Sequence, residues 1–536
     1  MIDRMTRILM LFTLMVVSTS CVVEDGEAPS RPNVIVILAD DMRVGYTGHE
    51  GHPIIDTPNI DSLAAGGTVF SNAFATSAVC TPSRTSLLTG LYERRHGINF
   101  NSNSSMSDEA YAQTYPMLLK NAGYFVGYVG KNHTPVGRNE EGIAGYGSGV
   151  MDASFDYWYA GHRHLTFYPK DIDRHNGFFA NAKADTQIEI IEEGMENFFT
   201  PDKVFQEGYD FLQSRPKDTP FALLLNFNVP HGSSTGSMAL RETDLPLYRT
   251  TYRDQIDQVE LSGTYIAEED IVTPKIPVSV YNGEYIGTYD YVKTPDDMRE
   301  REIRTIQTIS GIDRSLGRLL KNLEDQGVAD NTIIVFTSDH GLMHGEHGLG
   351  GKVLLYEPSI RIPMIVYDPR LKDVPVETTS DALVALVDIA PTLLNMADLP
   401  VPEEMQGKNL QALILDAESK WRDSLFLENN MTIQNYPRME GVRTARWKYV
   451  RYFDKAKDQE YADMLVASIK GEQPVHEELY DLQSDPTESH NLAGDSDFAG
   501  TLDQLRAENA ALVKRYRGDE PLKTYVMKKT VVDEGG

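Results

Sequence analysis

The chain has 536 residues, of which 41% are hydrophobic and 24% are charged, a composition typical of a globular protein rather than a disordered one. Its formal net charge of −29, with no run of Lys and Arg, argues against nucleic acid as a partner. A chain of this length exceeds one ordinary core, so we expect one large domain followed by a smaller one.

Residues 1–20 are predicted to be an export signal. Arg4 and Arg7 precede an apolar run over residues 8–17, which is too short to span a membrane. The small residues before Cys21 resemble a bacterial lipoprotein cleavage site, and a simple secretory signal is the alternative. Residues 22–31 are polar and are predicted to be a tether. Cys80 is the only other cysteine, so lipidation of Cys21 would leave no pair for a disulfide.

The first predicted strand, residues 33–39, is a continuous apolar and β-branched run, as expected of a strand buried on both faces of a parallel sheet. It ends in Asp40 and Asp41. Two adjacent carboxylates repel each other unless a cation joins them, although a solvated turn is the other interpretation. Open α/β sheets bind ligands beyond the carboxyl ends of their strands, which favours a cation site here.

The stretch from Ala78 to Gly90 is predicted to place Cys80 at the N-terminus of a helix. Pro82 suits a first helical turn because its φ is fixed and its missing N–H would be unpaired there. Such a terminus favours a thiolate, a phosphate or a sulfate, and Arg84 lies one turn further on. The alternative is that Cys80 is an ordinary buried small residue.

Three more predicted strands end in residues capable of chemistry. Residues 125–129 lead to Lys131 and His133, residues 221–228 lead to His231, and residues 332–337 lead to Asp339 and His340, with Lys352 following. The nearby histidines lack the His-Glu-x-x-His spacing of a helical zinc site. Because four buried strands all end in such residues, we expect one shared pocket at the carboxyl edge of the sheet.

The remaining predictions concern helices and loops. Residues 137–199 are predicted to be loops over the site, and residues 232–297 an insertion that shapes specificity. Helices are predicted over residues 115–122, 205–212, 301–323 and 382–397.

The stretch from Ala78 to Gly90 also resembles the signature of the type I sulfatases, Cys-x-Pro-Ser-Arg followed by an apolar pair and Thr-Gly. A second signature, Gly-Tyr…Gly-Lys-x-His, is matched from Gly123 to His133, except that Val126 stands where Ser or Thr is commoner. This resemblance covers nearly the whole mature chain. It implies an alkaline-phosphatase-like α/β fold: a mixed, mostly parallel sheet flanked by helices, with a smaller C-terminal α+β subdomain on an antiparallel sheet.

The resemblance also implies how the site works. In that family the cysteine is oxidised to formylglycine (3-oxoalanine) by a maturation enzyme, and its hydrated aldehyde is the nucleophile. Position 80 would be this nucleophile, and His231 would protonate the leaving oxygen. The expected ligands of one Ca²⁺ are Asp40, Asp41, Cys80, Asp339 and His340. The expected catalytic residues are Cys80, Arg84, Lys131, His133, His231 and Lys352.

The predicted substrate is a sulfated carbohydrate, such as an algal or matrix polysaccharide or its oligosaccharides, hydrolysed to release inorganic sulfate. Arg94, Arg95 and His96 follow the nucleophile helix and are candidates to read a neighbouring sugar carboxylate or sulfate, or else are surface charges. We expect a catalytic domain over residues 32–420 and a C-terminal subdomain over residues 421–536, at the cell surface or in the periplasm, with a lipid anchor as the only membrane contact. The alternatives are a phosphatase or phosphonate hydrolase of the same fold and an inactive glycan-binding lipoprotein.

Overall fold

The computed structural model describes residues 31–138, 148–162, 201–231, 249–281, 294–376, 378–416, 418–454, 460–518 and 522–526, together with Gly142 and Gly145. The predicted export signal and nearly all of the tether lie outside these residues. None of the helices in the described ranges has the length and apolar composition needed to cross a bilayer.

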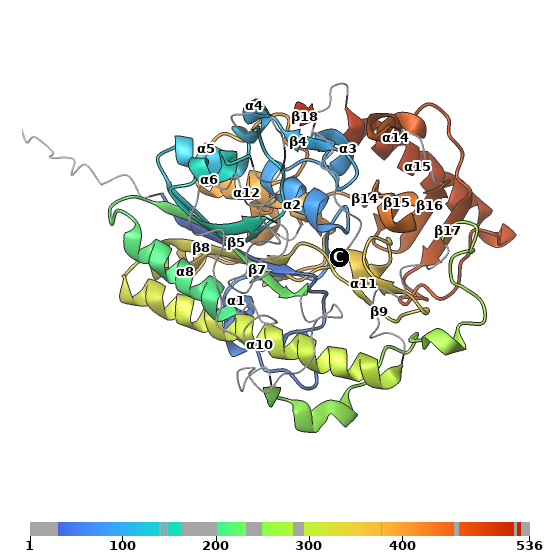
Figure 1. Ribbon diagram of the computed structural model, residues 1–536, viewed down its shortest axis with the longest axis horizontal. Coiled ribbons are helices and arrows are strands. Elements are labelled where there is room, and N and C mark those ends of the chain that lie inside the picture. The colour runs from blue at the N-terminus through green and yellow to red at the C-terminus, as the bar shows by residue number, and fades with distance from the viewer. Residues whose placement is uncertain are drawn as a thin grey trace, which may run out of the picture.

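An eight-stranded mixed sheet forms the centre of the molecule, with strand order β12-β2-β11-β8-β1-β7-β5-β6 (Figure 1). Its middle consists of four parallel strands, β8 (Thr332–Ser338), β1 (Asn33–Asp40), β7 (Phe221–Pro230) and β5 (Phe125–Asn132). β6 (Tyr157–His162) extends this parallel set. On the other edge β11 (Met364–Tyr367) runs antiparallel to both β8 and β2 (Thr68–Phe70), and β12 (Thr379–Ser380) is parallel to β2. The predicted mixed, mostly parallel sheet is confirmed.

Both faces of the sheet are covered, which explains why β1 is apolar without alternation. Val34 and Val36 pack in one apolar cluster with Leu87 and Leu119, whereas Ile35 belongs to another on the opposite face. The first face carries α2 (Cys80–Thr89), α5 (Tyr115–Asn121) and α12 (Ile389–Met396), and the second carries α1 (Pro58–Gly66), α8 (Pro201–Ser214) and α10 (Pro295–Asp325) (Figure 1). Each fully buried Ile or Leu in these layers contributes about 1.5–3 kcal/mol of transfer free energy.

A four-stranded antiparallel sheet lies at the C-terminal end of the chain, in the order β14 (Ser424–Asn429), β15 (Arg438–Thr444), β16 (Trp447–Phe453) and β17 (His476–Asp481). The helix α15 (Ala499–Arg517) packs against it. The predicted antiparallel subdomain is thereby confirmed, while the exact boundary at residue 420 stays a prediction. The hydrophobic core of this subdomain is continuous with that of the preceding part of the chain, because Val79 and Val353 share one apolar cluster with residues of this sheet.

The shorter elements complete the described chain. They are β3 (Ala73–Phe74), α3 (Glu93–His96), β4 (Ser104–Met106), α4 (Asp108–Tyr111), α6 (Val150–Ser154), β9 (Met343–His344), β10 (Gly350–Gly351), α11 (Glu357–Ile360), β13 (Val384–Ala385), α13 (Gln411–Leu415), α14 (Tyr461–Ala467) and β18 (Thr524–Val526).

Two predicted segments differ from the structure. The helix predicted over residues 382–397 begins only at Ile389, because Pro391 must lie in the first turn; the residues before it form β13 and a 3-10 turn. The stretch 137–199, predicted to be loops, contains α6 and β6 in its described part, and the rest lies outside the described residues. Of the predicted insertion, only residues 249–281 and 294–297 are described, and the last three of these open α10.

Candidate active site

The ends of the four central strands meet at one edge of the sheet. β8, β1, β7 and β5 are direct neighbours in that order, and their carboxyl ends carry the residues singled out from the sequence. Asp40 is the last residue of β1 and Lys131 the second-last of β5, while His231 and Asp339 directly follow β7 and β8. The prediction that these side chains would share one location is confirmed.

The helix α2 aims its N-terminus at this edge. Val79 is extended, with φ −142° and ψ 134°, and helical geometry begins at Cys80, as predicted. The first helical hydrogen bond runs from the Ser83 N–H to the Val79 carbonyl at 3.0 Å, and Pro82 occupies the first turn, where it needs no partner for an N–H. Gly90 ends the helix in the left-handed conformation at φ 67°.

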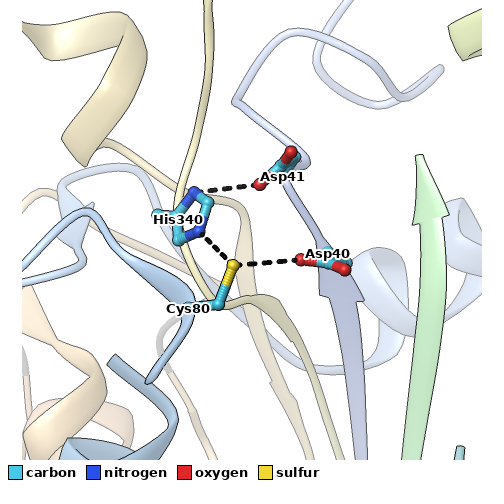
Figure 2. Close-up of side chains that lie close together, drawn as sticks. All are labelled: Asp40, Asp41, Cys80 and His340. Carbon is cyan, nitrogen blue, oxygen red and sulfur yellow. Dashed lines mark hydrogen bonds and ion pairs between the residues drawn. The ribbon is translucent and has the colours of Figure 1, made fainter. Parts of the chain in front are cut away.

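Four polar groups surround the Cys80 thiol, and Figure 2 shows two of them, His340 and Asp40. Its Sγ atom lies 3.2 Å from His340 Nε2, 3.1 Å from Lys352 Nζ, 3.6 Å from Lys131 Nζ and 3.8 Å from Asp40 Oδ1. Cys80 itself is 2% exposed. Two ammonium groups and a helix N-terminus thus face position 80, which distinguishes Cys80 from an ordinary core cysteine.

Each carboxylate of the site faces a cation. Lys131 forms an ion pair with Asp40, Lys352 Nζ lies 2.9 Å from Asp41 Oδ1, and Arg84 Nε lies 2.9 Å from Asp339 Oδ2. Burial by itself raises the pKa of Asp40, but the charges of Lys131, Arg84 and Lys352 together outweigh it and the net pKa lies below the ordinary value. The same holds for the pKa of Asp41, where burial is outweighed by Lys352, His340 and Lys131 together. Asp40 and Asp41 are therefore ionised at neutral pH.

The chain turns sharply at the end of β1. Asp41 has a φ of 67°, a left-handed conformation that non-glycine residues adopt at a cost. Its N–H donates to Asp339 Oδ1 at 3.1 Å, and the next N–H, that of Met42, donates to Ser338 Oγ at 2.9 Å. The turn thus points the Asp41 carboxylate toward Lys352 and His340 and not into solvent.

The side chains fit a divalent cation. One ligand atom from each of Asp40, Asp41, Cys80 and His340 lies within 4.8 Å of the others. Asp41 Oδ2 is buried and has no hydrogen-bond partner among the described residues, as expected of an oxygen reserved for a cation. Carboxylate oxygens are the ligands that Ca²⁺ prefers. Asp339, also predicted as a ligand, is not in this group, because its oxygens accept from Arg84 and from the backbone N–H groups of Asp41 and His340.

Two histidines flank the thiol on the open side. His231 Nε2 lies 3.7 Å from Asp41 Oδ2. Burial, and next the charges of Lys352 and Lys131, hold the pKa of His231 well below its ordinary value. The backbone carbonyl of His133 accepts a hydrogen bond from Thr81 Oγ1 at 2.9 Å, which ties the end of β5 to the first turn of α2.

A pocket of about 220 Å³ opens above the thiol. Four of its lining residues are polar, namely Cys80, His133, His231 and Lys352. The apolar part of the lining is formed by Val79, Phe100, Val353, Met431, Ile433 and Tyr436. Phe100 and the last three were missed by the sequence analysis, since no periodicity or motif marks residues that reach the site only through the packing of the C-terminal sheet.

A buried network joins the two loops that carry the acidic groups. Arg43, two residues after Asp41, donates to Glu346 Oε1 at 2.6 Å. Tyr46 on the same loop donates to Glu302 Oε2 at 2.5 Å, and Glu302 Oε1 lies 2.6 Å from His344 Nδ1. Glu302 belongs to α10, so this helix clamps the loop after β1 to the loop after β8.

The prediction that Arg94, Arg95 and His96 lie where they could read a sugar requires correction. Arg94 is 0% exposed and is bound to Glu428 and Glu440, at 2.9 and 3.0 Å. Burial lowers the pKa of His96 to about 3, and its ring lies 3.2 Å from Ser86 Oγ. Arg95 lines a different hollow, with Leu91 and Leu522. Arg94 and His96 are neither surface charges nor substrate contacts.

Comparison with known proteins identifies the family. The family model described as sulfatase matches residues 32–399, which is well over half of the chain. The chain belongs to the sulfatase family. A second model, described as N-sulphoglucosamine sulphohydrolase, C-terminal, matches residues 345–467. This sulfatase is therefore a sulfuric ester hydrolase.

Its relatives cover almost its whole length. It is 27% identical to the N-acetylglucosamine-6-O-sulfatase of Bacteroides thetaiotaomicron, over 94% of this chain and 90% of the relative, and 26% identical to the ulvan-active sulfatase of Formosa agariphila, over 95% and 86%. Among solved structures, a protein in complex with its substrate D-glucosamine-2-N,6-O-disulfate has a TM-score of 0.63 at 24% identity, covering 92% of this chain and 100% of that one. The phosphonate monoester hydrolase of Agrobacterium radiobacter has a TM-score of 0.64 at 21% identity, covering 91% and 96%. The similarity to these two solved structures shows that this chain has the same fold.

Proposed function

We propose that this sulfatase hydrolyses a sulfated carbohydrate with a formylglycine made from Cys80 as its nucleophile. The observation that carries the proposal is the placement of Cys80 at the start of α2, with its Sγ 3.1 Å from Lys352 Nζ and 3.6 Å from Lys131 Nζ. Oxidation to a hydrated aldehyde would give position 80 two hydroxyls, one to attack sulfur and one to expel sulfate afterwards.

Calcium is the proposed cofactor. Asp40, Asp41 and His340, together with the side chain at position 80, would hold it, and Asp339 would join them if Arg84 releases one of its oxygens. When bound, the cation would lower the pKa of an oxygen at position 80 and withdraw charge from the sulfuryl group.

The cationic residues bind the sulfuryl group in this proposal. Lys131 and Lys352 face the thiol from two strand ends, so their ammonium groups lie where sulfuryl oxygens would gather. Arg84 holds Asp339 through Nε at 2.9 Å and thereby fixes one acidic loop against α2. His133 orients the nucleophile, since its backbone is tied to Thr81 next to Cys80.

His231 is the proposed proton donor. Its Nε2 would give a proton to the leaving sugar oxygen, which otherwise departs as a poor alkoxide. The charges of Lys131 and Lys352 lower the pKa of His231 after the larger effect of burial. A bound sulfate ester would place negative charge among Lys131, Lys352 and His231. Binding of the substrate would therefore raise the pKa of His231 and favour its protonated form.

Maturation and location complete the proposal. A formylglycine-generating enzyme would be the maturation partner, and the amino-terminal signal with Cys21 would place the protein in the periplasm or at the cell surface on a lipid anchor. Palmitate labelling compared between the parent and Cys21→Ser tests the anchor; equal labelling would contradict it.

The decisive experiment combines mass spectrometry with a phosphate control. Protein co-produced with a formylglycine-generating enzyme should show the aldehyde mass on the peptide containing Cys80, and should release sulfate from 4-nitrophenyl sulfate faster than phosphate from 4-nitrophenyl phosphate. Cys80→Ala and Cys80→Ser should both lose at least about 10³-fold in kcat while keeping the parent melting temperature. Faster phosphate release would favour the phosphonate hydrolase alternative, and an active Cys80→Ala would exclude this nucleophile.

A further inference from the structure

The pocket above Cys80 has a lining of two chemical kinds, and the apolar kind bears on which sugar can enter. Among the described residues that line the pocket, Lys352 is the only one with a permanent charge at neutral pH, and it already faces Asp41 and the thiol. Six of the ten lining residues are apolar or aromatic, namely Val79, Phe100, Val353, Met431, Ile433 and Tyr436. We call these six residues the apolar wall.

The apolar wall is held rigid before any ligand binds. Tyr436 stacks on Tyr281 with ring centroids 5.4 Å apart and an angle of 14° between the planes. Phe100 meets the His133 ring edge-on at 4.9 Å. A rigid aromatic surface loses little conformational entropy when a ring packs on it, which makes it a suitable platform for the C–H face of a pyranose.

Asparagine side chains lock the loop between β14 and β15, which carries three of the wall residues. Asn429 Nδ2 donates to the carbonyls of Met431 and Pro437, at 3.0 Å each. Asn101, next to Phe100, accepts from the Thr432 N–H at 3.3 Å and donates to the Asn430 carbonyl at 3.3 Å. These hydrogen bonds join the segment that carries Phe100 to the segment that carries Met431 and Ile433.

Among the described residues that line the pocket, the apolar wall offers no cationic partner to a second anionic group on the sugar. Arg94, the buried arginine nearest in sequence to the nucleophile helix, is committed to Glu428 and Glu440. A carboxylate or a second sulfate packed against the apolar wall would lose its hydration without a compensating charge, which costs several kcal/mol. The volume of about 220 Å³ lies below the roughly 300–1,000 Å³ of typical ligand pockets, so it takes a single ring.

We propose that the apolar wall selects an otherwise uncharged sugar ring bearing one sulfate, and that Ile433 at its rim determines this specificity. The inference rests on the proposed function and deepens it. Ile433 is 43% exposed, an unusual degree for a large apolar side chain beside a catalytic pocket.

The test uses position-matched pairs of substrates and the matured enzyme. Each pair carries its sulfate at the same carbon, and one member has a neutral ring while the other has a second anion, as in N-acetylglucosamine 6-sulfate against D-glucosamine-2-N,6-O-disulfate. The parent should prefer the neutral member by at least about 10-fold in kcat/KM, the range that one apolar contact provides. Ile433→Lys should lower or reverse that ratio, and Ile433→Ser should raise KM for the neutral ring with little change in kcat.

Val374→Lys is the matched control, because Val374 is also 43% exposed and does not line this pocket. The ratio of kcat/KM between the two members of a pair should be the same in Val374→Lys as in the parent. Equal rates on both members of every pair, or a parent-like ratio in Ile433→Lys, would overturn the inference and leave the sulfatase proposal intact. Hydrolysis of 4-nitrophenyl sulfate without release from any sugar would also overturn it. No hydrolysis of any sulfate ester by protein with the aldehyde in place would instead refute the proposed function.

Discussion

Replacing Arg94 by Met should destabilise the protein without a selective effect on substrate binding. The Arg94 side chain is fully buried; its Nε lies 2.9 Å from Glu428 Oε2 and its Nη2 lies 3.0 Å from Glu440 Oε1. Glu440 keeps Arg451 as a partner in the variant, whereas Glu428 keeps only neutral donors such as Asn430. Removing one partner of a buried ion pair costs about 3–5 kcal/mol, since the other charge is left in the interior.

Urea unfolding at pH 7 and kcat/KM on one substrate measure the two halves of this prediction. The double variant Arg94→Met/Glu428→Gln should recover part of the loss, because it removes the orphaned charge as well. Arg95→Met is the matched control on the same short helix; it should cost about 1 kcal/mol or less. The reasoning is refuted if Arg94→Met keeps the parent unfolding midpoint and raises KM, because that result would indicate that Arg94 contacts the substrate.

Three further outcomes are expected. Glu302→Gln should lower the free energy of unfolding by about 1.5–3 kcal/mol at pH 7 and weaken Ca²⁺ binding measured by calorimetry, because a charged clamp between the two acidic loops is lost; unchanged Ca²⁺ affinity would contradict the clamp. Burial, with the charge of Glu428, raises the pKa of Glu93 from 4.5 to about 7. Its ionisation therefore removes stability as pH rises from 4.5 toward 7, and Glu93→Gln should gain melting temperature over the parent between pH 5 and pH 8. Calcium at 100 times its Kd should stabilise the protein by about 2.7 kcal/mol, and EDTA should reverse the gain; a melting temperature indifferent to both would argue against the proposed ligands.

The strand ends were predictable from the sequence because each central strand is largely apolar and has polar residues at or just after its carboxyl end. Such a run requires cover on both faces, and parallel strands carry their carboxyl ends to one edge. Asp40, Lys131, His231 and Asp339 therefore meet in the structure as their positions in the chain imply. The start of α2 at Cys80 followed from the local restriction that Pro82 imposes.

Long-range packing was not predictable in the same way. Met431, Ile433 and Tyr436 reach the pocket only because the C-terminal sheet docks beside α2, and no local pattern records that docking. Arg94 was misinterpreted for a related reason. A charged residue three positions before a glycine looks exposed until Glu428, 334 residues later, is placed against it.

The burial of Cys80 has a consequence for the order of events in biosynthesis. The thiol is covered by His340 and Lys352, which are 260 and 272 residues further along the chain. Cys80 is also in the first turn of α2 and almost fully buried, so the folded protein offers an enzyme no access to this thiol. The proposed oxidation of Cys80 therefore has to precede the packing of His340 and Lys352 over it, so the rate of folding limits the time in which the chain can be modified.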